Sequence, residues 1–158
     1  YGNLTRIGIA MYGVDPRGEE NNDLKQAMSL YTKVAMVKVV PKGEKIGYGM
    51  TYTADEDQYI ATLPIGYADG WFRRFSECGV KVAVNGKNYP ICGRICMDQC
   101  MIDFGADCTA KRWDKAVLFG DSSDGALQTA DDIAHLTGTI SYEITCGISK
   151  RVPRVFVQ

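Results

Sequence analysis

Residues 80–93, VKVAVNGKNYPICG, decide the fold class of this chain. Apolar and polar side chains alternate on both sides of Asn85-Gly86, as they do in strands with one buried face. Asn and Gly accept the positive φ angles of a type I′ turn, which joins two antiparallel strands with the twist of a sheet. The stretch therefore predicts a β-hairpin.

The segments around this hairpin extend the β pattern in both directions. The run LYTKVAMVKVV at residues 30–40 alternates apolar and polar side chains well enough for one strand. Further along the chain, TADDIAHLTG predicts a short helix with Thr129 as its N-cap. The opening LTRIGIAMYGV is apolar and β-rich, and the stretch from residue 140 to the end predicts a helix or turn and then a strand. Further strands are expected in QYIATLP and AVLFG. The fold class is therefore mainly β with one or two short helices, best met by a small closed or nearly closed barrel.

Composition excludes several classes of protein. The 158 residues are 46% hydrophobic with a net charge of −1 and evenly mixed charges, which does not suit an electrostatic nucleic-acid binder. No apolar run approaches the roughly 20 residues that span a bilayer, and the start lacks the features of a signal peptide. Six cysteines in a chain of this size favour reduced thiols, although an even count leaves disulfides open. We expect a cytoplasmic domain without membrane contact, and a membrane domain upstream stays open.

Three cysteines are spaced four apart in PICGRICMDQCMI, at positions 92, 96 and 100. Pro90, Gly93 and the isoleucines favour a strand-like path, on which positions four apart lie roughly 13 Å from each other. The usual zinc and iron–sulfur spacings are missing as well. We therefore expect small buried thiols and no metal site.

Six stretches in chain order resemble the C-terminal part of bacterial alanine racemases: RIGIAMYG, IGYGMTYTA, LPIGYADGWFRR, GRICMDQCM, SYEITCGIS and RVPRVF. The resemblance runs over nearly the whole chain and extends to alanine/serine racemases linked to vancomycin resistance. It implies a homodimeric enzyme that makes D-alanine or D-serine for the cell wall. In this family a TIM-type barrel carries pyridoxal phosphate on a lysine, and a mostly β domain completes the active site of the neighbouring subunit. Residues 1–13 would then be the end of the barrel, and residues 14–158 the β domain.

The resemblance implies cofactor contacts near both ends of the chain. Arg6 matches the arginine that faces the pyridine nitrogen, and the amides of Gly8 and Ile9 match the positions that bind the phosphate. An arginine keeps its proton, so the ring nitrogen stays largely unprotonated. Lys150 stands where many alanine racemases have a tyrosine. A lysine can reach a phosphate but supplies no flat phenol wall, which favours serine more than a tyrosine would.

The resemblance also assigns catalysis and substrate binding. Tyr48 matches the catalytic tyrosine, and the backbone N–H of Met97 matches the group that binds the substrate carboxylate. Racemisation needs a base on one face of the α-carbon and an acid on the other. Gly47 and Gly49 let the backbone bring the ring of Tyr48 to an exposed position, whereas composition alone would make it a core aromatic. The positions that match the substrate entrance are Tyr67, Arg73 and Arg94; without the resemblance they would be surface residues.

The motif of the cofactor lysine does not occur in the chain, and His135, the single histidine, lies in the predicted helix. We therefore expect the chain to be one domain of a longer racemase and to be inactive alone. The alternative is a non-catalytic β-barrel module for dimerisation or ligand gating.

Overall fold

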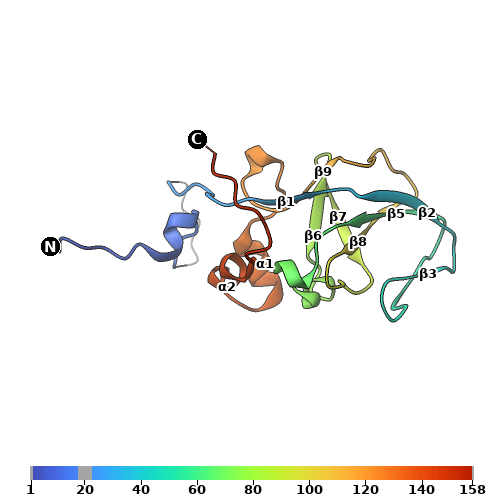
Figure 1. The fold of residues 1–158 in the computed structure, drawn as a ribbon, viewed down its shortest axis with the longest axis horizontal. Coiled ribbons are helices and arrows are strands. Elements are labelled where there is room, and N and C mark those ends of the chain that lie inside the picture. The colour runs from blue at the N-terminus through green and yellow to red at the C-terminus, as the bar shows by residue number, and fades with distance from the viewer. Residues whose placement is uncertain (1, 18–22, 158) are drawn as a thin grey trace.

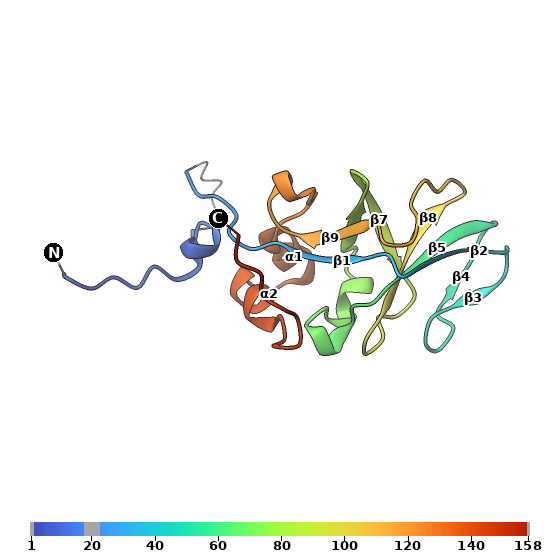
Figure 2. The ribbon, with the colours of Figure 1, turned by 45° about the horizontal axis from the view of Figure 1, so that its top comes forward.

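The structure, a computed structural model, describes residues 2–17 and 23–157. Within these residues seven strands form one antiparallel sheet in the order β1-β9-β6-β7-β8-β5-β2, and β3 and β4 form a separate hairpin. The strands are β1 (Leu30–Lys33), β2 (Met36–Val40), β3 (Lys45–Ile46), β4 (Tyr52–Thr53), β5 (Gln58–Leu63), β6 (Lys81–Val84), β7 (Lys87–Cys92), β8 (Cys100–Gly105) and β9 (Lys115–Phe119). Two α-helices, α1 (Ala130–Thr137) and α2 (Ser141–Gly147), lie at one end of the sheet, and the β3–β4 hairpin lies at the other (Figures 1 and 2). Four short 3₁₀ helices complete this part: η1 (Gly8–Tyr12), η2 (Tyr67–Asp69), η3 (Arg73–Ser76) and η4 (Ser122–Asp124).

The two edges of the sheet belong to one continuous stretch of chain. β1 pairs with β9, and β2, which begins three residues after β1 ends, pairs with β5 at the opposite edge. The chain passes from one edge of the sheet to the other at Val34 and Ala35. The N–H of Val34 donates to the Asp114 carbonyl and the N–H of Ala35 donates to the Thr62 carbonyl, both at 2.9 Å. The mainly β, nearly closed barrel is therefore confirmed, but the single strand expected over residues 30–40 is two strands with different partners.

The β6–β7 hairpin is confirmed with its turn. Asn85 has φ 50° and Gly86 φ 76°, both positive as a type I′ turn requires, and Val84 pairs with Lys87 across it. The helix at residue 130 is confirmed with its cap, because Thr129 Oγ1 accepts from the Asp132 N–H at 3.1 Å and Asp132 Oδ2 accepts from the Thr129 N–H at 2.7 Å.

The core lies inside the curved sheet and under the helices. Its largest side chains are Trp71 and Phe75, whose rings meet edge to face at 4.8 Å and are both at most 2% exposed. The strands contribute further buried aliphatic residues, among them Leu63, Val82, Ile102 and Leu118, and the helices contribute Ile133 and Ile144. No helix in the described residues combines the length and the apolar character that a membrane span requires.

Both ends of the chain differ from the sequence-based expectation. The apolar opening does not form a strand: residues 8–12 form η1, between Gly8 at φ 68° and Gly13 at φ 84°, and Leu4, Ile7 and Met11 are exposed. The final strand is also absent from residues 148–157, because Arg154 donates to the carbonyls of Ile148, Ser149 and Val152 and so folds this segment on itself. In the described residues neither segment pairs with a strand, so β propensity alone does not make it a strand.

Candidate active site

Four of the predicted site residues line one open hollow of about 760 Å³. They come from three separate segments: the β3–β4 hairpin, the turn with η2 and η3 that follows β5, and the loop between β7 and β8. The residues that line the hollow are Tyr48, Tyr67, Phe72, Arg73, Ile95, Cys96 and Met97. Sequence reasoning missed Phe72 and Ile95, which supply apolar wall and carry no chemical signal of their own.

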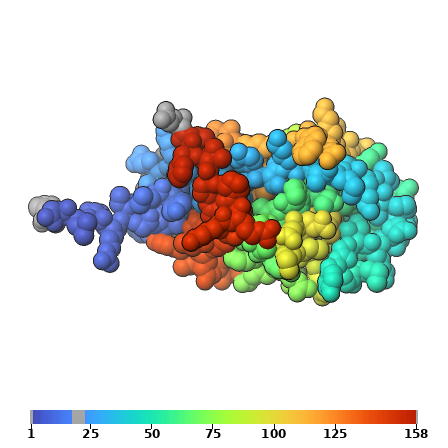
Figure 3. Space-filling view, in the orientation of Figure 1, coloured from blue at the N-terminus to red at the C-terminus, as the bar shows by residue number. Residues whose placement is uncertain are grey.

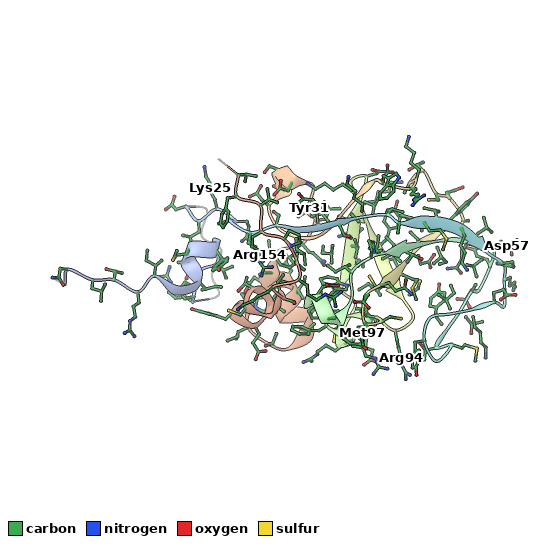
Figure 4. All side chains as sticks on the ribbon, viewed as in Figure 1. Lys25, Tyr31, Asp57, Arg94, Met97 and Arg154 are labelled. Carbon is green, nitrogen blue, oxygen red and sulfur yellow. The ribbon has the colours of Figure 1, made fainter. Side chains whose placement is uncertain are left out.

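Tyr48 is presented at the tip of the β3–β4 hairpin. Gly47 and Gly49, at φ 80° and 77°, turn the chain on either side of it, and Tyr48 is 75% exposed. The interpretation of Tyr48 as a core aromatic is therefore excluded. A Cβ on Gly49 would lie 3.1 Å from Arg94 Nη1, so the guanidinium packs against the tip that carries the phenol. Arg94 and Met97 lie at the same lower edge of the molecule (Figure 4).

The base of this hairpin is fixed by a polar network. Tyr52 Oη donates to Asp103 Oδ2 on β8 at 2.8 Å and accepts from Gln58 Nε2 on β5 at 2.6 Å. Burial, followed by the hydrogen bond to Asp103, raises the pKa of Tyr52 to about 12. The phenol therefore stays protonated at neutral pH and keeps donating to Asp103.

The turn that carries Tyr67 is held against the loop that carries Met97. The N–H groups of Tyr67 and Ala68 donate to the carbonyls of Cys96 and Met97 at 3.1 and 3.0 Å. A Cβ on Gly66 would lie 2.3 Å from the Cys96 oxygen and 2.4 Å from the Met97 oxygen, so only glycine permits this approach. Within the described part of the chain the Met97 N–H donates to no acceptor, which leaves it available to a ligand.

The cysteines follow two patterns. Cys92 on β7 and Cys100 on β8 are buried, and burial raises the pKa of Cys92 to about 12, as expected of packing thiols. Cys96 is different: residues 93–99 are a loop and not a continuous strand, and Cys96 lines the hollow. β7 runs through Pro90, which pairs with Lys81, and ends at Cys92, directly before Gly93. Among the described residues no group of three or more His, Cys, Asp or Glu could hold a metal ion.

The remaining predicted residues lie elsewhere. Arg6 and Gly8 are exposed on the N-terminal segment, which projects from the body of the molecule, away from Arg94 and Met97 (Figures 1 and 4). Ile9 buries its side chain in η1. Lys150 is exposed between Ser149 and Arg151, which both contact Asp69 in the turn beside the hollow.

A sequence model of a protein family matches residues 27–156, and its description is "Alanine racemase, C-terminal domain". This chain belongs to the alanine racemase family. The family match covers the whole sheet, both α-helices and all loops around the hollow.

Alanine racemases of several bacteria match along nearly the whole chain. The alanine racemase of Cutibacterium acnes is 51% identical over 155 residues, and that of Treponema denticola 46% over 158; each alignment covers 98% of this chain and 41% of the relative. The alanine racemase of Bacillus anthracis with bound L-Ala-P is 44% identical with a TM-score of 0.84, over 96% of this chain and 39% of that one. The enzyme of Streptomyces coelicolor is 42% identical with a TM-score of 0.85, over 95% and 39%. The chain thus spans about two fifths of the length of these relatives.

Alanine racemases use pyridoxal phosphate, so the hydrogen-bond donors of the N-terminal segment can be compared with the acceptors of this cofactor. Gly8 has φ 68°, and among the described residues a Cβ there would meet only Tyr142 Oη, at 3.5 Å. The exposed guanidinium of Arg6 and the backbone N–H groups of Gly8 and Ile9 suit a ring nitrogen and a phosphate in donor type. These residues therefore fit the cofactor in their chemistry.

Proposed function

We propose that this chain is the C-terminal domain of a pyridoxal-phosphate-dependent racemase that interconverts the enantiomers of alanine, and that Tyr48 is its catalytic acid–base group. The observation that carries the proposal is the convergence of Tyr48, Tyr67, Arg73 and Met97 on one hollow from three separate segments. A barrel kept only for dimerisation does not need an exposed tyrosine between two left-handed glycines beside an arginine.

Each of these groups has a separate task in the proposed reaction. The free N–H of Met97 binds the substrate carboxylate, and Arg73 attracts it at the mouth. The phenol oxygen of Tyr48 takes a proton from the α-carbon, or returns one, on one face. Arg94, packed beside Gly49, places a positive charge at the hairpin tip that carries Tyr48. Phe72 and Ile95 limit water around the exchanged proton.

The cofactor, when bound, draws electrons from the α-carbon and so makes its proton acidic enough to exchange. Arg6, Gly8, Ile9 and Lys150 are the residues proposed to hold it. The base on the second face is the family's lysine, whose motif lies outside this sequence.

We further propose that two copies of the longer protein build each active site. The N-terminal segment, which carries Arg6 and Gly8, projects away from the β3–β4 hairpin, which carries Tyr48 (Figure 1). This separation supports a homodimer in which Tyr48 serves the cofactor of its partner. Lys150 keeps serine open as a second substrate, because it removes the phenol that would shape a small pocket.

A racemisation assay of the full-length protein, with alanine and serine in parallel, tests this function. We expect turnover of alanine by the full-length protein, and neither turnover nor Schiff-base absorbance from residues 1–158 alone. Absence of turnover by a cofactor-loaded full-length protein would favour the non-catalytic module. Turnover by residues 1–158 alone would contradict the proposed division of labour.

A further inference from the structure

One guanidinium joins two carboxylates beside the hollow. Arg151 Nη2 donates to Asp98 Oδ1 at 2.6 Å, and Arg151 Nε lies 3.4 Å from Asp69 Oδ1. Asp69 is nearly buried, with 13% of its side chain exposed, whereas Asp98 and Arg151 are each more than half exposed. The C-terminal segment that carries Arg151 lies against the residues of the β7–β8 loop (Figure 3). Sequence analysis had not singled out Arg151, although it begins the motif RVPRVF.

Both carboxylates are next to proposed substrate-binding groups. Asp98 directly follows Met97, whose N–H is free. Asp69 Oδ2 accepts from the Gly66 N–H at 3.0 Å and so closes the turn that carries Tyr67. A negative charge on either carboxylate, if it is not neutralised, would repel an anionic ligand that approaches these groups.

The backbone does not need Arg151 to keep this geometry. The Tyr67 turn and the Met97 loop are already joined by two backbone hydrogen bonds, and Asp69 is bound to Gly66 within its own turn. What Arg151 adds is positive charge. Without it, the carboxylate that follows Met97 in the chain and the carboxylate of the adjoining turn would lose their counter-charge and would repel a substrate carboxylate nearby.

The neighbouring arginine of the same segment performs a different task. Arg154 donates to three backbone carbonyls, at 2.7, 2.7 and 2.8 Å, and forms no ion pair with a carboxylate of the described residues. The two arginines are therefore a natural pair for comparison: one balances charge at the hollow, the other holds the segment.

We propose that Arg151 is a positioning residue that neutralises Asp98 and Asp69 and thereby allows an amino acid carboxylate to reach the Met97 N–H. This inference rests on the proposed function. It predicts an effect on substrate binding and little effect on the proton transfer that Tyr48 performs.

The test measures KM and kcat of the full-length holoenzyme for alanine in Arg151→Gln, Arg151→Lys, Arg151→Gln/Asp98→Asn and Arg154→Gln. In Arg151→Gln we expect KM to rise about threefold to tenfold at low salt with kcat nearly unchanged, the modest size that exposed charges produce. Added salt, about 0.5 M, should reduce that rise by screening. Arg151→Lys keeps the charge and the double variant removes the unbalanced carboxylate, so both should return KM towards that of the unmodified enzyme. Arg154→Gln removes an equal charge from the same segment but leaves Arg151 in the chain, so it should raise KM less than Arg151→Gln does.

Cofactor absorbance shows that each variant is folded and loaded. An unchanged KM in Arg151→Gln overturns the inference. A raised KM that persists both at high salt and after Asp98→Asn overturns it too, because the role would then be structural. If the unmodified holoenzyme does not racemise alanine at all, it is the proposed function that fails, which separates the two outcomes.

Discussion

The loops around the hollow and the N-terminal segment both carry proposed site residues, but the chain holds them very differently. Around the hollow, backbone packs on backbone: Gly66 approaches the Cys96 and Met97 carbonyls so closely that no Cβ fits. On the N-terminal segment, the Tyr142 hydroxyl is the one group from residues 2–17 and 23–157, chain neighbours aside, within 4 Å of where a Cβ on Gly8 would be. Arg6 and the apolar Leu4 and Ile7 are exposed there.

This difference shows which of the proposed site residues are held in place by contacts within this chain. Tyr48, Tyr67 and Met97 have positions set by contacts within residues 23–157, so they can be mutated with a clear structural expectation. Arg6 and Gly8 have few such contacts, and their conformation depends on what they pack against. The predictions below probe this contrast, beginning with the largest expected effect.

Replacing Tyr48 with Phe tests the hollow most directly. In the full-length enzyme we expect racemisation to fall about 10²- to 10⁴-fold in both directions, because one proton-transfer partner is lost while the ring remains. Schiff-base absorbance should be unchanged. With α-deuterated substrate, the enantiomer whose proton Tyr48 abstracts should lose exchange with solvent more than the other. Tyr31, half exposed on β1, offers the matched control: Tyr31→Phe should behave as the unmodified enzyme. Near-normal turnover by Tyr48→Phe would remove this residue from the active site.

Two glycine substitutions compare the regions within residues 1–158. Gly66→Ala forces a methyl group into two backbone carbonyls, and we expect a loss of about 3 kcal/mol or more in the free energy of unfolding, roughly 10 °C in Tm. Gly8→Ala meets only strain at φ 68°, which costs at most about 1–2 kcal/mol, and the exposed segment can relax. Thermal unfolding followed by circular dichroism measures both. Equal losses would show that the N-terminal segment is packed as tightly as the hollow.

Alkaline pH should weaken the sheet that supports the hollow. The folded chain raises the pKa of Tyr52 from 10.0 and of Cys92 from 9.0, each to about 12, mainly by burial. The unfolded chain therefore loses these protons first, so stability is complete below pH 9 and falls as pH rises towards 12. The urea midpoint, measured with a reductant present, should decrease over this range. Tyr52→Phe should flatten the decrease above pH 10, the unshifted pKa of the phenol. A midpoint independent of pH would contradict this account of the network.

Lys150 is proposed both to hold the cofactor, as Arg6 and Gly8 do, and to shape the substrate pocket. Its replacement tests which of these two roles it has. Lys150→Tyr in the full-length enzyme should shift the ratio of alanine to serine turnover towards alanine by about fivefold, the value of one hydrogen bond of about 1 kcal/mol. An aromatic ring narrows the pocket and removes a donor for the serine hydroxyl. A changed affinity for the cofactor with an unchanged ratio would place Lys150 with Arg6 and Gly8 instead.

Local patterns of the sequence predicted those parts of the fold that local physics determines. The β6–β7 turn follows from Asn85-Gly86, and the start of α1 follows from Thr129 and Asp132 three residues later. What failed depended on distant partners. The division of residues 30–40 into β1 and β2 is set by β9 and β5, which no alternation of apolar residues reveals.

The site was predicted unevenly for a similar reason. Resemblance named the proposed site residues, and four of them line the hollow. It did not reveal the charge balance around them, because the contact between Arg151 and Asp98 joins residues more than fifty apart in sequence. Both residues stand in stretches that carry the resemblance, GRICMDQCM and RVPRVF, but nothing in these stretches pairs the two, and only the folded chain places them together.

The closure of the sheet by one stretch of chain has a consequence for synthesis of the protein. β2 can pair with β5 soon after both have been made, but β1 must wait for β9, so that Leu30 meets Phe119 only when most of the chain has left the ribosome. Until β9 has been made, β2 is paired but the edge of β1 is not. Such long-range pairing forms slowly, and the unpaired edge is open to aggregation. Rare codons or a stalled ribosome between residues 63 and 115 should therefore lower the yield of folded protein more than the same pause after residue 119.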